Sequence, residues 1–427
     1  MPDRKLDAII FIPGLGDWID QSVDGIARRI AAALDRNAQT AQAQFNLKLE
    51  ARDEEYASRR GLDRKARVRA IFRNDGGQDA PVLDVYELEY RPTLTKNYAQ
   101  QNALRNSARL FLTLATNFHR LLQAVASPVK GPAAKAQLYF ALFILSLLVA
   151  YMAVLIVTAV ETLRESPQVV SALAAYLPKP AEAGETPPAA APGATAALSL
   201  LQTLVVAVAL VQTIWPGLRE GLIKSAVTYI SVIDYLSYGD RREVIAGQVS
   251  DLLEHVAEKG AYRRIHIVAY SFGSLVALDN VFPLGRKPGE RFKLVHTLVT
   301  IGCPFDIVRM FWPNYFQKRQ AWPGAPQHWY NLYLPIDVLG SNFRDGDEPG
   351  PATKGIELVE EKDGPERKPD NLAYTRGLDR ESLSPLAWLA LTGLRAHANY
   401  WEAEYESEMS CFSDLTLKLY AGDPLLQ

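Results

Sequence analysis

The chain has 427 residues, of which 48% are hydrophobic and 22% are charged, so it holds enough apolar material for a sizeable core and wholesale disorder is excluded. The 46 Lys and Arg residues nearly balance the 48 Asp and Glu residues, which argues against a dedicated nucleic-acid-binding protein. Two cysteines cannot build a disulfide framework or a zinc cluster. The length allows two or three domains, or one large α/β domain with insertions.

The N-terminal region predicts a buried strand followed by a helix. The apolar run Ala8–Pro13 is shorter than the core of a secretion signal, which spans about 7–15 apolar residues. Because the run leads directly into Gly14-Leu15-Gly16, we expect a strand at Ala8–Ile12 that enters a tight loop. Ser22–Leu34 has apolar residues at helical spacing. Residues 36–66 are charged and carry little signal, so we expect a surface excursion there.

The next segments predict two strands and a helix. Arg67–Phe72 and Val82–Tyr90 have the composition of strands, and the second half of Val82–Tyr90 alternates apolar and acidic residues. Ala99–Ala126 is helical in pattern.

Two uncharged segments are long enough to cross a membrane. Leu138–Val160 has no charged residue and would extend roughly 34 Å as a helix, more than a hydrocarbon core of about 30 Å, so it predicts a transmembrane helix. Leu198–Trp215 is also uncharged but contains two Gln and two Thr residues. It predicts a second span whose polar stripe can face the first. The Pro- and Ala-rich segment Pro178–Ala197 between them predicts a flexible loop, so the pair forms a hairpin.

The flanking charges orient this hairpin. We expect the loop outside and both flanks in the cytoplasm, because basic residues concentrate on the outer flanks. The flanks carry Arg120, Lys130, Lys135, Arg219 and Lys224, whereas the loop carries only Arg164 and Lys179. The predicted organisation is therefore a first half of an α/β domain at residues 1–130, a membrane hairpin at 131–220 and the second half at 221–427.

The second half alternates helices and strands. Arg242–Glu258 predicts an amphipathic helix, and strands are predicted at Arg264–Ala269, Leu294–Ile301 and Trp329–Leu334. Such alternation predicts an α/β fold with a mostly parallel sheet flanked by helices on both faces.

A serine follows the first of these strands in the pattern of a nucleophile. The strand runs into Ala269-Tyr270-Ser271-Phe272-Gly273, and Ser274–Val281 is helical in pattern. Small residues two positions before and after the serine let strand and helix pass close together, which is typical of the strained turn that exposes a nucleophilic serine. The alternative is that Ser271 only caps the helix.

Two backbone amides could stabilise an oxyanion beside this serine. An acyl-transfer site needs two preorganised N–H donors. We expect one from Phe272, directly after the serine, and one from Leu15 in the loop after the first strand. An ordinary strand-to-helix loop or a phosphate cradle is the alternative, although the loop sequence GLGDW lacks the patterns of nucleotide-binding loops.

On the segments FIPGLGDW and IVAYSFGS, with two downstream segments, the chain resembles the α/β-hydrolase superfamily in its esterase/lipase-like branch. The resemblance covers roughly residues 5–100 and 225–405, and it implies a triad in the chain order Ser, Asp or Glu, His. His397 is the predicted base, since it lies late in the chain. Asp337, three residues past a predicted strand, is the predicted acid. Asp306, just past the preceding strand, is the alternative acid.

The expected activity is cleavage of a hydrophobic ester or lipid by a membrane-anchored serine hydrolase that needs no cofactor or metal. The segment 310–330 carries seven aromatic residues and could either cover the site and bind an acyl chain or pack as core. Two other functions stay open: an acyltransferase or thioesterase with the same triad, and an inactive hydrolase-like membrane receptor or scaffold.

Overall fold

The computed structural model describes the chain in separate ranges, which are residues 6–15, 21–40, 47–58, 61–75, 78–99, 139, 142, 146, 231–237, 239–259, 262–335, 337–346, 349–359, 366–374, 396–397, 400 and 411–420. The Cα positions divide into two compact units. One consists of Met1–Lys96, His119–Phe140 and Asp234–Gln427, and the other of Asn97–Phe118 and Ala141–Ile233.

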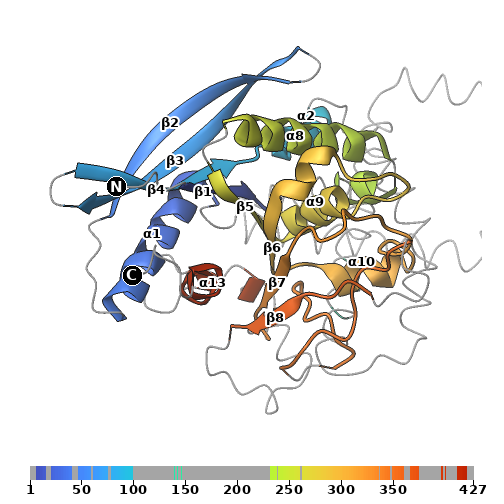
Figure 1. The fold of residues 1–427 in the computed structure, drawn as a ribbon. Coiled ribbons are helices and arrows are strands. Elements are labelled where there is room, and N and C mark those ends of the chain that lie inside the picture. Colours follow the sequence, from blue (N-terminus) through green and yellow to red (C-terminus); the bar gives the residue numbers. More distant parts are fainter. Residues whose placement is uncertain are drawn as a thin grey trace, which may run out of the picture. The chain divides into compact units, whose positions relative to one another are not determined.

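The described strands form one eight-stranded sheet in the order β2-β3-β4-β1-β5-β6-β7-β8 (Figure 1). All neighbours from β4 to β8 are parallel, whereas β3 is antiparallel to both β2 and β4. This confirms the predicted α/β fold with a mostly parallel sheet. The strands are β1 (Leu6–Ile12), β2 (Leu47–Ala57), β3 (Asp63–Asp75), β4 (Gln78–Glu87), β5 (Tyr262–Tyr270), β6 (Val295–Ile301), β7 (His328–Tyr333) and β8 (Asp370–Ala373).

Helices flank the sheet on both sides, as predicted (Figure 1). On one face α1 (Val23–Thr40) and α13 (Cys411–Tyr420) share a core with alternate residues of the central strands, among them Ile9 and Val268. On the other side lie α8 (Gly239–Glu258) and α9 (Phe272–Val281). Other described helices are α2 (Arg91–Ala99), the 3-10 turn Glu290–Leu294 and α10 (Phe305–Phe311).

The expected surface excursion at residues 36–66 is wrong. Residues 47–57 form β2, which pairs with β3 from Leu47↔Arg73 to Ala57↔Asp63. The side chains of β2 alternate between half-buried and exposed over most of its length, and the exposed positions carry charges such as Lys48 and Glu50. Charged residues protect an edge strand from pairing with other chains. Because charged residues are so frequent in Leu47–Ala57, apolar and polar residues do not alternate clearly in the sequence, and the strand was not predicted.

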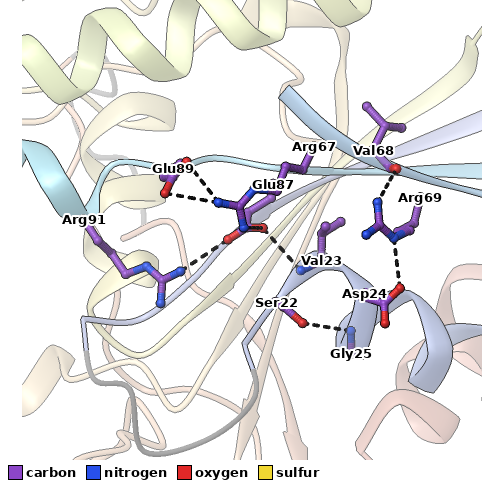
Figure 2. A network of polar contacts seen from close by, with 10 residues as sticks. All are labelled: Ser22, Val23, Asp24, Gly25, Arg67, Val68, Arg69, Glu87, Glu89 and Arg91. Carbon is purple, nitrogen blue, oxygen red and sulfur yellow. Dashed lines mark hydrogen bonds and ion pairs between the residues drawn. The ribbon is translucent and has the colours of Figure 1, made fainter. Parts of the chain in front are cut away.

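The start of α1 is fixed to the end of β4 by a polar network (Figure 2). The Ser22 hydroxyl accepts the Gly25 N–H at 3.2 Å, which is a helix N-cap bond. The Glu87 carboxylate accepts the Val23 N–H at 3.3 Å and is flanked by Arg67 and Arg91. Burial raises the pKa of Glu87, although the nearby Arg67 opposes the shift. These bonds anchor the far end of the loop that leaves β1.

The two proposed membrane spans lie outside the described residues, apart from Tyr139, Leu142 and Ser146, which are helical. The predicted helix Ala99–Ala126 also lies outside them, except for its first residue. None of the helices that the structure does describe combines the length and the apolar character needed to cross a bilayer.

A buried charge cluster lies at the amino end of the central strands. Arg263 and Arg264 both donate to the fully buried carboxylate of Asp7, and the His266 ring lies 3.5 Å from it. Neither ring nitrogen of His266 has a hydrogen-bond partner among the described residues. Burial lowers the pKa of His266. Burial, together with the charges of His266 and Arg264, also lowers the pKa of His296 to about 4.

These histidines predict a loss of stability in mild acid. A histidine whose pKa is lower in the folded state than its usual 6.5 favours the folded state only in its neutral form. Its contribution to the free energy of unfolding is therefore present above about pH 6.5 and is lost as the pH falls toward 4. His296→Gln should therefore reduce the fall in thermal midpoint between pH 7 and pH 5. Lys293→Gln, at a nearby exposed position, should leave the fall unchanged. Equal falls in wild type and His296→Gln would contradict the assignment.

Candidate active site

Ser271 occupies a strained turn between β5 and α9. Its φ of 53° is positive, which is uncommon for a residue other than glycine and persists only where the surrounding structure enforces it. The Ser271 N–H donates to the carbonyl of Ile301 at the end of β6, at 2.7 Å. Its side chain makes no capping bond to α9, so the simple helix-cap alternative is wrong. The Ser271 hydroxyl is therefore available to bond to a residue outside α9, and the turn that carries it is half-buried.

Gly273 is required by the close approach of β1 to α9. A Cβ at this position would lie 2.3 Å from the carbonyl oxygen of Ile12 and 2.5 Å from that of Pro13. Side chains cannot be accommodated at such distances from the backbone. The contact brings the loop that leaves β1 against the first turn of α9 and so places this loop beside Ser271.

The structure brings Ser271, His397 and Asp337 into one hydrogen-bonded chain, although they are far apart in the sequence. His397 Nε2 lies 2.7 Å from Ser271 Oγ, and His397 Nδ1 lies 2.8 Å from Asp337 Oδ2. The Asp337 side chain is fully buried, and that of His397 is 12% exposed. Asp337 Oδ1 accepts the N–H of Leu339 at 2.8 Å, which fixes the second carboxylate oxygen.

The alternative acid, Asp306, is engaged elsewhere. Its carboxylate accepts a hydrogen bond from the Ser341 hydroxyl and lies 3.5 Å from Lys354 Nζ. Asp306 is the second residue of α10, and Asp337 follows β7, so both acids lie beyond the carboxyl ends of neighbouring strands. Of these two acids, only Asp337 is hydrogen-bonded to His397 in the described part of the chain.

The loop after β1 is held by two buried side chains. The Gly14 N–H donates to Gln21 Oε1 at 2.6 Å, and the Tyr90 hydroxyl donates to the Pro13 carbonyl at 2.7 Å. A Cβ on Gly14 would lie 3.0 Å from Ser271 Cβ. Because the Gly14 amide is used by Gln21, it is not available to an oxyanion, and the predicted donor Leu15 is the next residue of this loop.

Phe272, the other predicted donor, is the first residue of α9. The first amides of a helix have no acceptor within the helix, and the helix N-terminus favours negative charge. The Phe272 ring packs edge-on against Tyr235 with the ring centres 5.1 Å apart, which fixes the residue. The predicted oxyanion donors thus follow two neighbouring strands, Leu15 after β1 and Phe272 after β5, and Ser271 itself also follows β5.

Two tyrosines and a glycine that the sequence analysis did not single out complete the surroundings of His397. The Tyr270 ring stacks on the imidazole at 5.3 Å, and its hydroxyl donates to the His397 carbonyl at 2.5 Å. Tyr400 donates to Asp337 Oδ2 at 2.7 Å. Gly302 has a φ of 57°, and a Cβ there would lie 3.1 Å from the imidazole. The available signals were the position of Tyr270 beside the serine and the spacing of three residues between His397 and Tyr400.

The aromatic segment 310–330 packs in part as core. Tyr315, Phe316 and Trp329 are buried. Arg319 is also buried and pairs with Asp279 of α9 at 2.7 Å. The ion pair and the buried rings tie this segment to the helix that follows Ser271.

No group of three or more His, Cys, Asp or Glu side chains among the described residues is arranged to hold a metal ion. Cys303 and Cys411 are both buried and form no disulfide with each other. No protein-family model matches this chain, and no curated protein or solved structure is significantly similar to it.

Proposed function

We propose that the protein is a serine hydrolase of the α/β-hydrolase type that cleaves a carboxylic ester through Ser271, His397 and Asp337. The observation that carries this proposal is the continuous hydrogen-bonded chain from Ser271 Oγ through both nitrogens of His397 to Asp337. A nucleophile bonded to a base that is itself oriented by a third group is the arrangement by which a serine becomes nucleophilic at neutral pH.

The donor and acceptor roles in this chain follow from chemistry. An ionised carboxylate only accepts, so His397 Nδ1 carries the proton and Nε2 is the acceptor for the Ser271 hydroxyl. His397 takes the hydroxyl proton as Ser271 Oγ forms a bond to the carbonyl carbon of the ester. The imidazolium, stabilised by Asp337, then donates that proton to the departing alkoxide as the ester C–O bond breaks.

Water completes the reaction by the same steps, with water as the nucleophile and Ser271 Oγ as the leaving group. His397 removes a proton from water, the hydroxide attacks the acyl carbon, and the proton returns to Ser271 Oγ as the acid leaves. The Leu15 and Phe272 amides would stabilise the oxyanion of both tetrahedral intermediates. This role is supported by the close approach of the β1 loop to Ser271 and by the first position of Phe272 in α9.

We propose a hydrophobic ester or lipid as the substrate and a membrane as the location. The support comes from the uncharged segments Leu138–Val160 and Leu198–Trp215 and from the aromatic residues near α10. A chain anchored in a bilayer meets its lipids at high local concentration.

The test of the activity is covalent labelling of the full chain with a fluorophosphonate probe, which reacts only with an activated serine. We expect stoichiometric labelling, with the modified peptide containing Ser271. Labelling of a different serine, or none at neutral pH in folded protein, would refute the proposal.

Removal of the proposed membrane hairpin should make the protein soluble without detergent. Replacing Leu138–Trp215 by a flexible linker should give a protein that stays in solution without detergent and keeps its fluorophosphonate labelling, because both spans lie in one insertion. Sedimentation and labelling with and without detergent measure this. A detergent requirement that survives the deletion would contradict the assignment of the spans.

The orientation of the hairpin has its own test. Gly184→Cys lies in the predicted external loop, and Lys65→Cys lies at an exposed position of β3. Both native cysteines are buried, so an impermeant thiol reagent should report the introduced ones. In intact cells Gly184→Cys should react and Lys65→Cys should not. The reverse pattern would invert the topology.

A further inference from the structure

The Tyr400 hydroxyl has a fixed proton direction. It lies 3.0 Å from the backbone nitrogen of Leu334 and 2.7 Å from Asp337 Oδ2. An amide N–H can only donate, so the hydroxyl accepts from Leu334 and its single proton goes to Asp337. The Tyr400 side chain is fully buried, and burial, with the neighbouring charge of Asp337, raises the pKa of its phenol well above the usual value. The phenol therefore keeps its proton at neutral pH.

Tyr400 and His397 bond to the same oxygen. Asp337 Oδ2 receives the Tyr400 hydroxyl at 2.7 Å and His397 Nδ1 at 2.8 Å, whereas Oδ1, as far as the described residues go, receives the Leu339 N–H alone. A second donor on one carboxylate oxygen draws electron density from that oxygen and weakens its hold on the first donor's positive charge. The hydroxyl and the imidazolium thus compete for one acceptor.

Two glycines leave room for this shared bond. A Cβ at Gly340 would lie 2.3 Å from Asp337 Oδ2 and 2.6 Å from the Tyr400 hydroxyl. A Cβ at Gly302 would lie 2.8 Å from the Tyr400 ring and 3.1 Å from the His397 ring. The loops that follow β6 and β7 therefore both lack side chains where the tyrosine meets the acid and the base.

We propose that Tyr400 is a positioning residue that holds the Asp337 carboxylate toward His397 and keeps the basicity of His397 low enough for it to act near neutral pH. This inference rests on the proposed hydrolase function. Among the described residues, the titratable groups that face His397 are Ser271 and Tyr270 at the end of β5, Asp337 after β7, and Tyr400. Cys411 of α13 contacts the Tyr400 backbone. Tyr400 alone among them donates to the acid.

The experiment measures the rate of fluorophosphonate labelling of the full chain from pH 5 to pH 9 in wild type and Tyr400→Phe. Labelling requires neutral His397, so the rate rises with pH through the apparent pKa of the base. Without the competing hydroxyl, Asp337 stabilises the imidazolium more strongly. We expect the midpoint to rise by about half a unit to one unit in Tyr400→Phe, with a smaller loss of rate on the high-pH plateau.

Tyr270→Phe is the matched control. It removes another hydroxyl beside the same imidazole, but this hydroxyl donates to the His397 backbone and not to Asp337. Its midpoint should equal that of wild type, even if its rate is lower. Replacement of Tyr400 by 3-fluorotyrosine, a more acidic phenol and a stronger donor, keeps the ring and should shift the midpoint downward. This second variant keeps the inference testable if Tyr400→Phe, which leaves the Leu334 N–H without an acceptor, does not fold.

The outcomes separate the two proposals. Unchanged midpoints in both Tyr400 variants, or an equal shift in Tyr270→Phe, would overturn the role of Tyr400 while Ser271 labelling in wild type still stands. Wild-type protein that is folded but does not label at Ser271 would overturn the hydrolase proposal and this inference together.

Discussion

Ser271→Ala is expected to abolish fluorophosphonate labelling and to lower the rate of ester hydrolysis by about 10⁴-fold or more, because no other group of the site can form the acyl-enzyme. The fold should be unaffected. Alanine has a Cβ like serine, so it keeps the positive φ of the turn without adding strain, and the Ser271 side chain makes no bond to α9. Rates with a soluble ester, together with circular dichroism, measure both effects.

Ser274→Ala provides the matched control. Ser274 lies one turn further along α9, is fully buried, and donates to the Ala269 carbonyl at 3.0 Å. Its loss should lower the free energy of unfolding by about 1 kcal/mol, as for a typical buried hydrogen bond, and leave labelling at Ser271 in place. Retention of hydrolysis in Ser271→Ala together with loss in Ser274→Ala would show that the nucleophile is wrongly assigned.

Asp337→Asn should lower the hydrolysis rate by about 10³- to 10⁴-fold. The amide has no charge to stabilise the imidazolium. It must also turn an NH₂ group either toward the Leu339 amide or toward the two donors Tyr400 and His397. The second orientation forces His397 into the tautomer that cannot accept the Ser271 proton. Steady-state kinetics at saturating substrate would measure the loss.

Asp306→Asn is the control for this variant, since both acids follow neighbouring parallel strands. Asp306 bonds to Ser341 and lies near Lys354, so the change should affect stability by no more than about 1 kcal/mol and the rate by less than about tenfold. A larger rate loss in Asp306→Asn than in Asp337→Asn would show that the acid is Asp306, which follows β6.

Much of the fold could be predicted because buried parallel strands are continuous apolar runs. Three strands were predicted with ends no more than two residues from those of β1, β5 and β6; they are Ala8–Ile12, Arg264–Ala269 and Leu294–Ile301. The edge strand β2 was missed, since it is half exposed and its charged side chains conceal the alternation. The four-residue strand β8 is too short to stand out against the flanking loop.

The local sequence by itself determined the turn at Ser271, because a strand, a serine between small residues and a helix restrict the backbone within a few positions. It favoured Asp337 as the acid and kept Asp306 as the alternative, since both aspartates come shortly after a predicted strand. Only the tertiary structure decided that His397 meets Asp337 and that Tyr400 shares its oxygen. These contacts join residues about 60 positions apart, and their distances depend on how the loops after β6, β7 and the C-terminal segment pack together, which no short-range pattern encodes.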